Sequence, residues 1–241
     1  MLELRKLSRH FGGVKAVDEL DLVVNKGEIL GLIGPNGSGK STTVNLITGV
    51  YGATTGSLHF KGKDISKLSE TQLIEVRKNI AYVFQNGALF DSMSVRDNLA
   101  YPLVEHTRLS DSEVDARIAK MLDLVKMQGS ENLLPASLSG GMQKRVGLAR
   151  AIILEPEVIL YDEPTAGLDP QNTRNLIEIM SKLREHGRSG IFVTHDIPSA
   201  LDVSDRIAIL YNRKIHIVDS VENIKKSQDP VVKAFIEGSV D

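Results

Sequence analysis

One loop motif constrains the fold of this chain more than any other feature: Gly34-Pro35-Asn36-Gly37-Ser38-Gly39-Lys40-Ser41. It matches the pattern G-x-x-x-x-G-K-[ST], in which a glycine-rich loop joins a strand to a helix. The flanking sequence fits that context. The apolar run 29–33 predicts a buried parallel strand, and residues 41–49 predict a helix with apolar residues at Val44, Leu46 and Ile47.

The residue types in this loop suit the binding of phosphate. Gly37 and Gly39 allow the backbone to turn its N–H groups toward phosphate oxygens, and the helix that follows adds the positive end of its dipole. Lys40 can reach the β- and γ-phosphates, and the Ser41 hydroxyl can ligate Mg²⁺. We therefore expect a nucleotide to be bound by Gly34, Asn36, Gly37, Ser38, Gly39, Lys40, Ser41 and Thr42.

The rest of the chain alternates short apolar strands with amphipathic helices, which predicts an α/β fold with a parallel sheet and helices on both faces. Residues 1–27 predict an antiparallel strand pair that turns at Gly12-Gly13. Residues 94–126 predict a helical insertion, because their apolar residues recur at helical spacing. A strand with a turn is expected at 56–63, and further strands at 80–84, 158–161, 190–194 and 206–210. Further helices are expected at 141–154 and 172–186, with a short helical tail at 222–241.

Two adjacent acids follow one of the predicted buried strands. Asp162 and Glu163 come directly after the apolar run 158–161. An Asp at this position can hold Mg²⁺, directly or through water. Because side chains alternate along a strand, we expect Glu163 on the opposite face, where it can polarise a water beside the terminal phosphate.

The composition excludes several other classes of function. The chain has no cysteine, which rules out a disulfide framework, a cysteine zinc site and a thiol nucleophile. Its 29 Lys and Arg residues against 31 Asp and Glu residues lack the basic excess of a general nucleic-acid binder. We expect neither a signal peptide nor a membrane span, so any membrane crossing falls to other chains.

Further motifs follow the phosphate loop in a characteristic order: Gln85, residues 138–142, Asp162-Glu163, residues 166–169 and His195. This order resembles the ATP-binding cassette (ABC) family over nearly the whole chain. The resemblance implies one ABC domain over 1–241, a P-loop NTPase with a RecA-like parallel sheet core and an N-terminal antiparallel β subdomain. It also implies a helical insertion subdomain at about 93–156 and a C-terminal helical tail at about 222–241.

The resemblance also implies functions for individual residues, with ATP and Mg²⁺ bound between two cassettes that face each other head to tail. Glu163 corresponds to the catalytic base and His195 to the switch histidine at the γ-phosphate. Gln85 corresponds to the glutamine that touches Mg²⁺ and couples to the permease. The metal ligands implied are Ser41, Gln85 and Asp162, and further nucleotide contacts are implied for Phe11 (on adenine), Ser139, Gly140, Gly141 and Asp169.

One position departs from the usual family signature, which ends in Gln. Here Met142 takes that place, and Gln143 comes one residue later. The contact that the family's glutamine side chain makes is therefore not carried over to this chain.

Local similarities point to two kinds of transporter. Residues 84–90, 100–107, 138–145 and 229–238 resemble the ATPases of Mla/Mce-type phospholipid transporters, whereas residues 11–17 and 45–50 resemble those of branched-chain amino acid importers. We weight the first set more heavily, because the family's coupling surface lies in it. The implied partners are a second cassette, integral membrane permease subunits and Mce-domain or other lipid-binding accessory proteins, with no nucleic acid. The implied location is the cytoplasmic face of the inner membrane, held there by the permease.

Three alternatives remain open at this point. The first is the ATPase of a branched-chain amino acid importer. The second is an ABC protein without a transporter, acting on ribosomes or DNA, although such proteins usually carry two cassettes or a coiled-coil insertion. The third is a binding module that does not hydrolyse ATP, although Glu163 and His195 are both in place.

Overall fold

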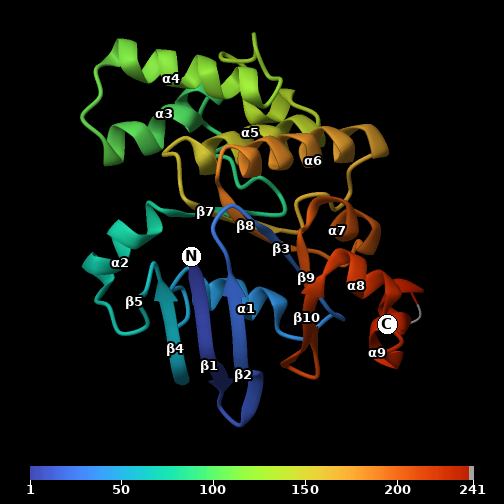
Figure 1. The fold of residues 1–241 in the computed structure, drawn as a ribbon. Helices are drawn as coiled ribbons and strands as arrows, with labels where there is room; N and C mark the ends of the chain where they lie inside the picture. The colour runs from blue at the N-terminus through green and yellow to red at the C-terminus, as the bar shows by residue number, and fades with distance from the viewer. Residues whose placement is uncertain (239–241) are drawn as a thin grey trace.

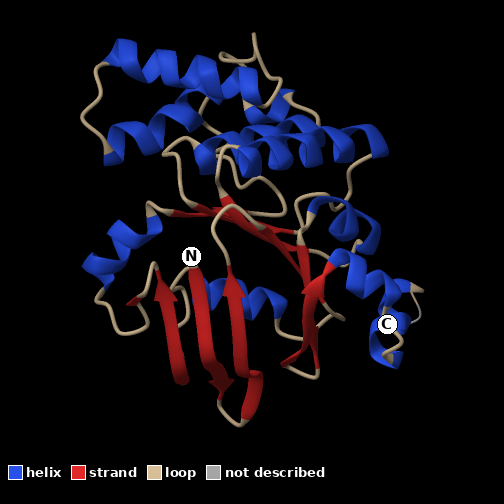
Figure 2. Ribbon diagram, viewed as in Figure 1, coloured by secondary structure: helices blue, strands red, loops and turns tan. Residues whose placement is uncertain are grey.

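A computed structural model describes residues 1–238, which form two β-sheets and a group of helices stacked on one of them (Figures 1 and 2). In chain order the elements are β1 (Leu2–Phe11), β2 (Val14–Val24), β3 (Ile29–Ile33), α1 (Lys40–Ile47), β4 (Thr55–Phe60), β5 (Lys63–Asp64), α2 (Glu70–Arg77), β6 (Ile80–Val83), α3 (Val95–His106), α4 (Asp111–Leu124), the 3-10 helix η1 (Pro135–Ser137), α5 (Gly140–Ile152), β7 (Val158–Asp162), α6 (Pro170–Glu185), β8 (Ser189–Val193), α7 (Ile197–Val203), β9 (Arg206–Tyr211), β10 (Lys214–Ser220), α8 (Val221–Lys226) and α9 (Pro230–Ile236).

The larger sheet has the strand order β10-β9-β3-β8-β7-β6, and all of its strands are parallel except β10, which pairs antiparallel with β9. Its central strands are buried on both faces, and their successive side chains point alternately into two separate hydrophobic cores. In β3, Ile29 and Ile33 belong to one core, while Leu30 and Leu32 belong to the other. This two-residue period explains why these strands are continuous apolar runs in the sequence.

The two faces of this sheet are covered differently. Helices, among them α5, α6 and α7, cover one face, and α1 lies between the other face and the second sheet (Figure 1). The second sheet is antiparallel, with the order β2-β1-β4-β5. The expected parallel sheet with helices on both faces and a separate antiparallel β subdomain is thus observed, and on the α1 side the antiparallel sheet completes the core.

The helices α3, α4 and α5 pack together beyond the large sheet (Figure 2). They fall within the segment 93–156 that we propose as the helical subdomain. An ion-pair triad ties it to α6: Glu178 binds Lys126 at 2.7 Å and Lys182 at 2.9 Å. The hydrogen bonds from these two ammonium groups lower the pKa of Glu178 to about 2.

The predicted strands and helices are confirmed with small shifts at their ends, but α2, β5, η1, α7 and β10 were not predicted from the sequence. The predicted C-terminal helical tail consists of α8 and α9, and residues 239–241 of that prediction lie outside the described residues. Within residues 1–238, no helix has the length and apolar character that a bilayer span requires.

Candidate functional site

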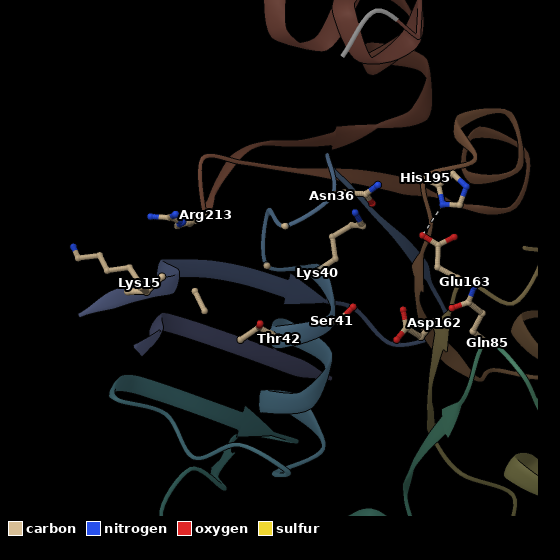
Figure 3. A pocket seen from close by; sticks show the side chains of 14 residues that line it. Lys15, Asn36, Lys40, Ser41, Thr42, Gln85, Asp162, Glu163, His195 and Arg213 are labelled. Atoms are coloured by element: carbon tan, nitrogen blue, oxygen red, sulfur yellow. Dashed lines mark hydrogen bonds and ion pairs between the residues drawn. The ribbon is translucent and has the colours of Figure 1, made fainter. Parts of the chain in front are cut away.

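A cavity of about 540 Å³ opens where the phosphate loop meets the carboxyl ends of the parallel strands (Figure 3). It brings together residues that are far apart in the sequence, as expected at the carboxyl edge of an open α/β sheet. Ten of the predicted site residues line it: Asn36, Gly37, Gly39, Lys40, Ser41, Thr42, Gln85, Asp162, Glu163 and His195. Four residues that were not predicted also line it: Val14, Lys15, Ala16 and Arg213.

Glycines shape the loop around this cavity for steric reasons. Gly37 and Gly39 have φ values of 75° and 110°, which side-chain-bearing residues rarely adopt. A Cβ at Gly34 would lie 2.2 Å from the carbonyl oxygen of Leu210, so the loop is pressed directly against the end of β9. The backbone N–H groups of the loop are thereby held in a fixed curve.

The loop contains a cation and a hydroxyl whose environment suits an anion. Lys40 is buried, and its Nζ donates to the carbonyl oxygens of Gly34 at 2.7 Å and Pro35 at 3.1 Å. Burial lowers the pKa of Lys40, and the nearby carboxylates of Glu163 and Asp162 oppose that shift. Within residues 1–238, the buried Ser38 Oγ has no hydrogen-bond partner. A phosphate group would stabilise the ammonium and satisfy this hydroxyl.

Asp162 ends β7 on the side of the sheet that faces α1. The Tyr82 hydroxyl donates a hydrogen bond of 2.7 Å to Asp162 Oδ2. Burial, followed by this hydrogen bond, raises the pKa of Tyr82 well above its usual value, so the phenol stays protonated and remains a donor. Tyr82 therefore holds one carboxylate oxygen of Asp162 and leaves the other facing the cavity.

The next residue, Glu163, carries the most elaborate set of contacts in the site. Its Oε1 lies 2.9 Å from His195 Nδ1, and its Oε2 accepts a hydrogen bond of 3.1 Å from the Thr194 hydroxyl. The Thr194 hydroxyl in turn accepts from the backbone N–H of Asp196 at 3.0 Å, which fixes its direction of donation. Glu163 is thus oriented by both residues that follow β8, and Figure 3 shows it beside His195.

The direction of Glu163 differs from the strand-based expectation. Alternation would place Asp162 and Glu163 on opposite faces, but both line the same cavity. The reason is that β7 ends at Asp162, and Glu163 turns out of the strand with a φ of 48°. The expectation of opposite faces was wrong, and the turn places both carboxylates beside Lys40.

The oxygen atoms at this end of the cavity fit a magnesium ion that is bound together with nucleotide phosphates. Ser41, Gln85 and Asp162 offer a hydroxyl, an amide oxygen and a carboxylate, which are the hard ligands that Mg²⁺ prefers. No cluster of three acidic or histidine side chains among the described residues could hold a metal ion without such help. The donor set thus suits an ion that also takes phosphate oxygens as ligands.

The segment after Gln85 is held against α5 by direct backbone contact. A Cβ at Gly147 of α5 would lie 2.6 Å from both the Cα and the O atom of Gly87. A Cβ at Gly87 would lie 2.9 Å from the carbonyl oxygen of Gln143, one helical turn earlier. The position of Gln85 in the cavity is therefore tied to the position of α5.

The other predicted nucleotide contacts lie outside the cavity. Ser139 accepts a hydrogen bond of 3.3 Å from the Met142 N–H and thereby caps α5. Asp169 caps α6 by accepting from the N–H groups of Gln171 and Asn172, and these hydrogen bonds lower its pKa. The structure does not bring Ser139, Gly140, Gly141 or Asp169 to the cavity of the same chain.

Gln143, the residue next to the altered signature position Met142, already makes hydrogen bonds within the chain. Gln143 Nε2 donates to the carbonyl oxygens of Pro135 at 3.0 Å and Leu138 at 3.3 Å. Gln143 thus closes the loop before α5, and Met142 packs against the core. Neither the Met142 nor the Gln143 side chain is therefore free to make the contact that the family's signature glutamine makes.

Phe11 also does not line the cavity in this structure. Its ring packs edge-on against Tyr51 with centroids 5.2 Å apart, and the Arg9 guanidinium lies 4.6 Å from the centre of the Phe11 ring. Phe11 is 42% exposed at the end of β1, and its proposed contact with adenine stays a prediction.

Comparison with known proteins gives matches over the whole chain. The model of the family described as "ABC transporter" matches residues 17–166. The intermembrane phospholipid transport system ATP-binding protein MlaF of Escherichia coli K12 is 38% identical over 242 aligned positions, covering 100% of this chain and 90% of MlaF. The probable ribonucleotide transport ATP-binding protein mkl of Mycobacterium leprae is 37% identical, covering 98% of this chain and 69% of its own.

Solved structures agree with these sequence matches. A dimeric structure of the ATP-binding cassette MJ0796 bound to ADP and Pi is 29% identical and superposes with a TM-score of 0.84. It covers 92% of this chain and 99% of the MJ0796 chain. The predicted fold class, a P-loop NTPase core with an antiparallel sheet and helices, is thereby confirmed.

Proposed function

Because this chain belongs to the ABC transporter family, we propose that it is the ATP-hydrolysing subunit of a membrane transporter that moves phospholipid through a separate permease. The observation that carries the cargo is the 38% identity with MlaF, which extends over the whole chain and includes the helical segment. The observation that carries the chemistry is the cavity where Lys40, Glu163 and His195 meet.

In the proposed reaction, the phosphate loop and Lys40 bind the polyphosphate of ATP, and Glu163 acts as general base. Its carboxylate is held by His195 and Thr194, so it can accept a proton from a water beside the γ-phosphate without first reorienting. Mg²⁺ bound by Ser41, Gln85 and Asp162 would neutralise charge on the phosphate oxygens. His195 is exposed beside Glu163, and we propose that it contacts the γ-phosphate there.

The remaining contacts are proposed to come from a second copy of the chain. Ser139 and Gly140 are exposed at the N-terminus of α5, where a Cβ at Gly140 would meet no atom within 4 Å. Such a surface can donate backbone N–H groups to an anion presented by a partner. The MJ0796 structures are dimeric, which supports pairing of two cassettes. We propose that the two copies of this chain face each other head to tail, so that each signature covers the partner's nucleotide.

A surface near Gln85 is proposed to dock the permease. The rings of Phe90 and Tyr101 pack edge-on with centroids 5.3 Å apart, although the two residues are 43% and 47% exposed. Val104, one turn further along α3, is 70% exposed. Exposed apolar side chains gathered on one face are typical of a protein interface. Its proximity to Gln85 would couple hydrolysis to permease helices.

The segment that carries Phe90 is held in place by side chains of α3 and α5. Asn98 is fully buried, and its side chain accepts from the N–H of Phe90 at 2.8 Å and donates to the carbonyl of the same residue at 3.1 Å. Arg150 of α5 donates to the carbonyl of Ala88 and lies 5.0 Å from the centre of the Phe90 ring. A shift of α5 would therefore move the docking surface as well as Gln85.

The experiment is affinity purification of the tagged chain from detergent-solubilised membranes, followed by mass spectrometry of bound proteins and lipids. The proposal expects a polytopic permease with co-purified phospholipid and, in an Mla-type complex, an Mce-domain or other lipid-binding protein. It also places the chain on the cytoplasmic face of the inner membrane. A permease with an amino-acid-binding protein would instead support the branched-chain importer, and ribosomes or DNA would refute transport.

A pair of variants tests the docking surface within the same experiment. Val104→Asp should lose the permease while retaining ATP binding, because Val104 does not line the cavity. Val23→Asp is the matched control, because Val23 is also exposed but lies on β2. Equal recovery of permease with both variants would contradict the proposed docking surface.

A further inference from the structure

The turn between β9 and β10 places an arginine at the edge of the nucleotide cavity. Tyr211 pairs with Lys214 across the two strands, so Asn212 and Arg213 alone form the turn. Their φ values are 49° and 66°, the signs required by a type I′ turn. Glycine is favoured at the second of these positions, so an arginine there is held in a costly conformation.

Contacts with the neighbouring sheet and loop hold the turn in place. The Asp18 N–H donates a hydrogen bond of 2.8 Å to the carbonyl oxygen of Arg213. Lys214 pairs with the Asp18 carboxylate at 3.4 Å. At the base of the hairpin, the carbonyl of Leu210 touches Gly34 closely enough to exclude a Cβ. The strained turn is thus fastened to β2 and to the start of the phosphate loop, as strained residues at functional sites usually are.

The Arg213 side chain offers a charge that the rest of the described chain does not use. Within residues 1–238, no carboxylate lies at ion-pair distance from the Arg213 guanidinium, whereas Lys15 pairs with Asp18 at 3.1 Å. Arg213 lines the nucleotide cavity and also a second hollow of about 350 Å³ beside residues 35–38. Its charge is therefore available to an anion held by the loop.

The position of Arg213 along the cavity identifies which part of a nucleotide it faces. Figure 3 shows Glu163 and His195 at one end, Lys40 between, and Lys15 and Arg213 at the other end. With the γ-phosphate at Glu163, the chain of phosphates runs from Lys40 toward Arg213. The end at Arg213 therefore receives the α-phosphate and the nucleoside.

We propose that Arg213 is a further nucleotide-binding residue whose guanidinium contacts the α-phosphate of ATP and ADP. This inference deepens the nucleotide site described above and rests on it. The geometry predicts a contribution to affinity that does not depend on the γ-phosphate. It also explains why a residue unsuited to the turn occupies it.

The test is calorimetric titration of ATP and ADP, without metal to prevent turnover, into the wild-type chain and Arg213→Gly. The expected result is an increase in Kd of about five- to tenfold for both nucleotides, the size of one exposed charge-assisted hydrogen bond. Arg213→Glu should weaken both more strongly, because it adds repulsion. Since glycine suits the turn, Arg213→Gly should unfold at or above the wild-type temperature; should it fail to fold, Arg213→Asn takes its place.

The matched control is Asn212→Gly, which changes the neighbouring turn residue, also with positive φ. Asn212 borders the second hollow but does not line the nucleotide cavity. Asn212→Gly should bind both nucleotides as the wild type does. Unchanged Kd values in Arg213→Gly, or a loss confined to ATP, would overturn the inference while leaving the site intact. If the wild-type chain bound neither nucleotide, the site itself would be wrong and this inference with it.

Discussion

Replacing Gly147 by alanine tests whether α5 and the segment after Gln85 move as one body. The added methyl group would lie 2.6 Å from the Cα and O atoms of Gly87 and 3.0 Å from its carbonyl carbon. Favourable separations between carbon atoms are about 3.5–4.0 Å, so the two backbones must separate by roughly 1 Å. Because every one of these neighbours is a backbone atom, no side-chain rotation can relieve the clash.

The size of the effect follows from two opposing contributions to the free energy of unfolding. In an open helix interior, Gly→Ala stabilises by about 1 kcal/mol. Overpacking of a close contact costs about 1–3 kcal/mol, and immobile backbone neighbours favour the upper end. We expect a net loss of about 1–2 kcal/mol, which lowers the unfolding temperature by about 2–4 °C per kcal/mol in a chain of this size.

Thermal unfolding and ATP hydrolysis are the two assays for Gly147→Ala. Hydrolysis should fall because the displaced segment draws Gln85 out of the cavity, whereas binding of ATP to the phosphate loop should persist. Gly52→Ala is the control, since a Cβ there meets no atom within 4 Å. If Gly147→Ala were more stable than the wild type and fully active, the backbone contact would be shown to relax freely, and the link between α5 and Gln85 would be refuted.

Three further substitutions test the site itself. Glu163→Gln should reduce hydrolysis by at least about 100-fold while ATP still binds, because it removes the base but keeps the shape; substantial turnover would contradict the assignment. Ser139→Arg should block hydrolysis without weakening ATP binding to the monomer, because Ser139 lies outside the cavity; equal loss of both would contradict the two-copy arrangement. Tyr82→Phe removes the hydrogen bond to Asp162 and should weaken Mn²⁺ binding to the ATP complex about tenfold, measured by electron paramagnetic resonance; superimposable Mn²⁺ titrations would show that Tyr82 does not orient Asp162.

The cavity was largely predictable because its residues stand at the carboxyl ends of parallel strands. Lys40, Asp162 and His195 each follow an apolar run in the sequence, and such strand ends meet at one edge of a sheet. Their convergence follows from topology alone. The direction of Glu163 was not predictable, because its positive φ breaks the alternation that holds within β7.

Strand β10 was missed because the hairpin before it lacks the usual local signal, whereas α2 and α7 begin at the N-cap residues Ser69 and Asp196, which were overlooked. The β9–β10 hairpin turns at Asn212-Arg213, without the glycine that normally marks such a turn, so both β10 and the cavity residue Arg213 escaped notice. The separation of Ser139 from the cavity was expected only from the family resemblance. It could not be predicted from the residues alone, because their order along the chain does not report distances between remote segments. Tyr82 was missed because its hydroxyl meets Asp162 only through the pairing of β6 with β7.

The outward-facing cap of α5 at Ser139 has a consequence for how much ATP unassembled subunits consume in the cell. If each reaction centre needs the cap of another copy, unassembled subunits at low abundance rarely meet and leave the ATP pool untouched. A permease that binds two subunits holds them close together, so their effective concentration is set by the dimensions of the permease and not by their abundance in the cell. The permease, which uses the free energy of ATP hydrolysis, would then also activate that hydrolysis by bringing two subunits together.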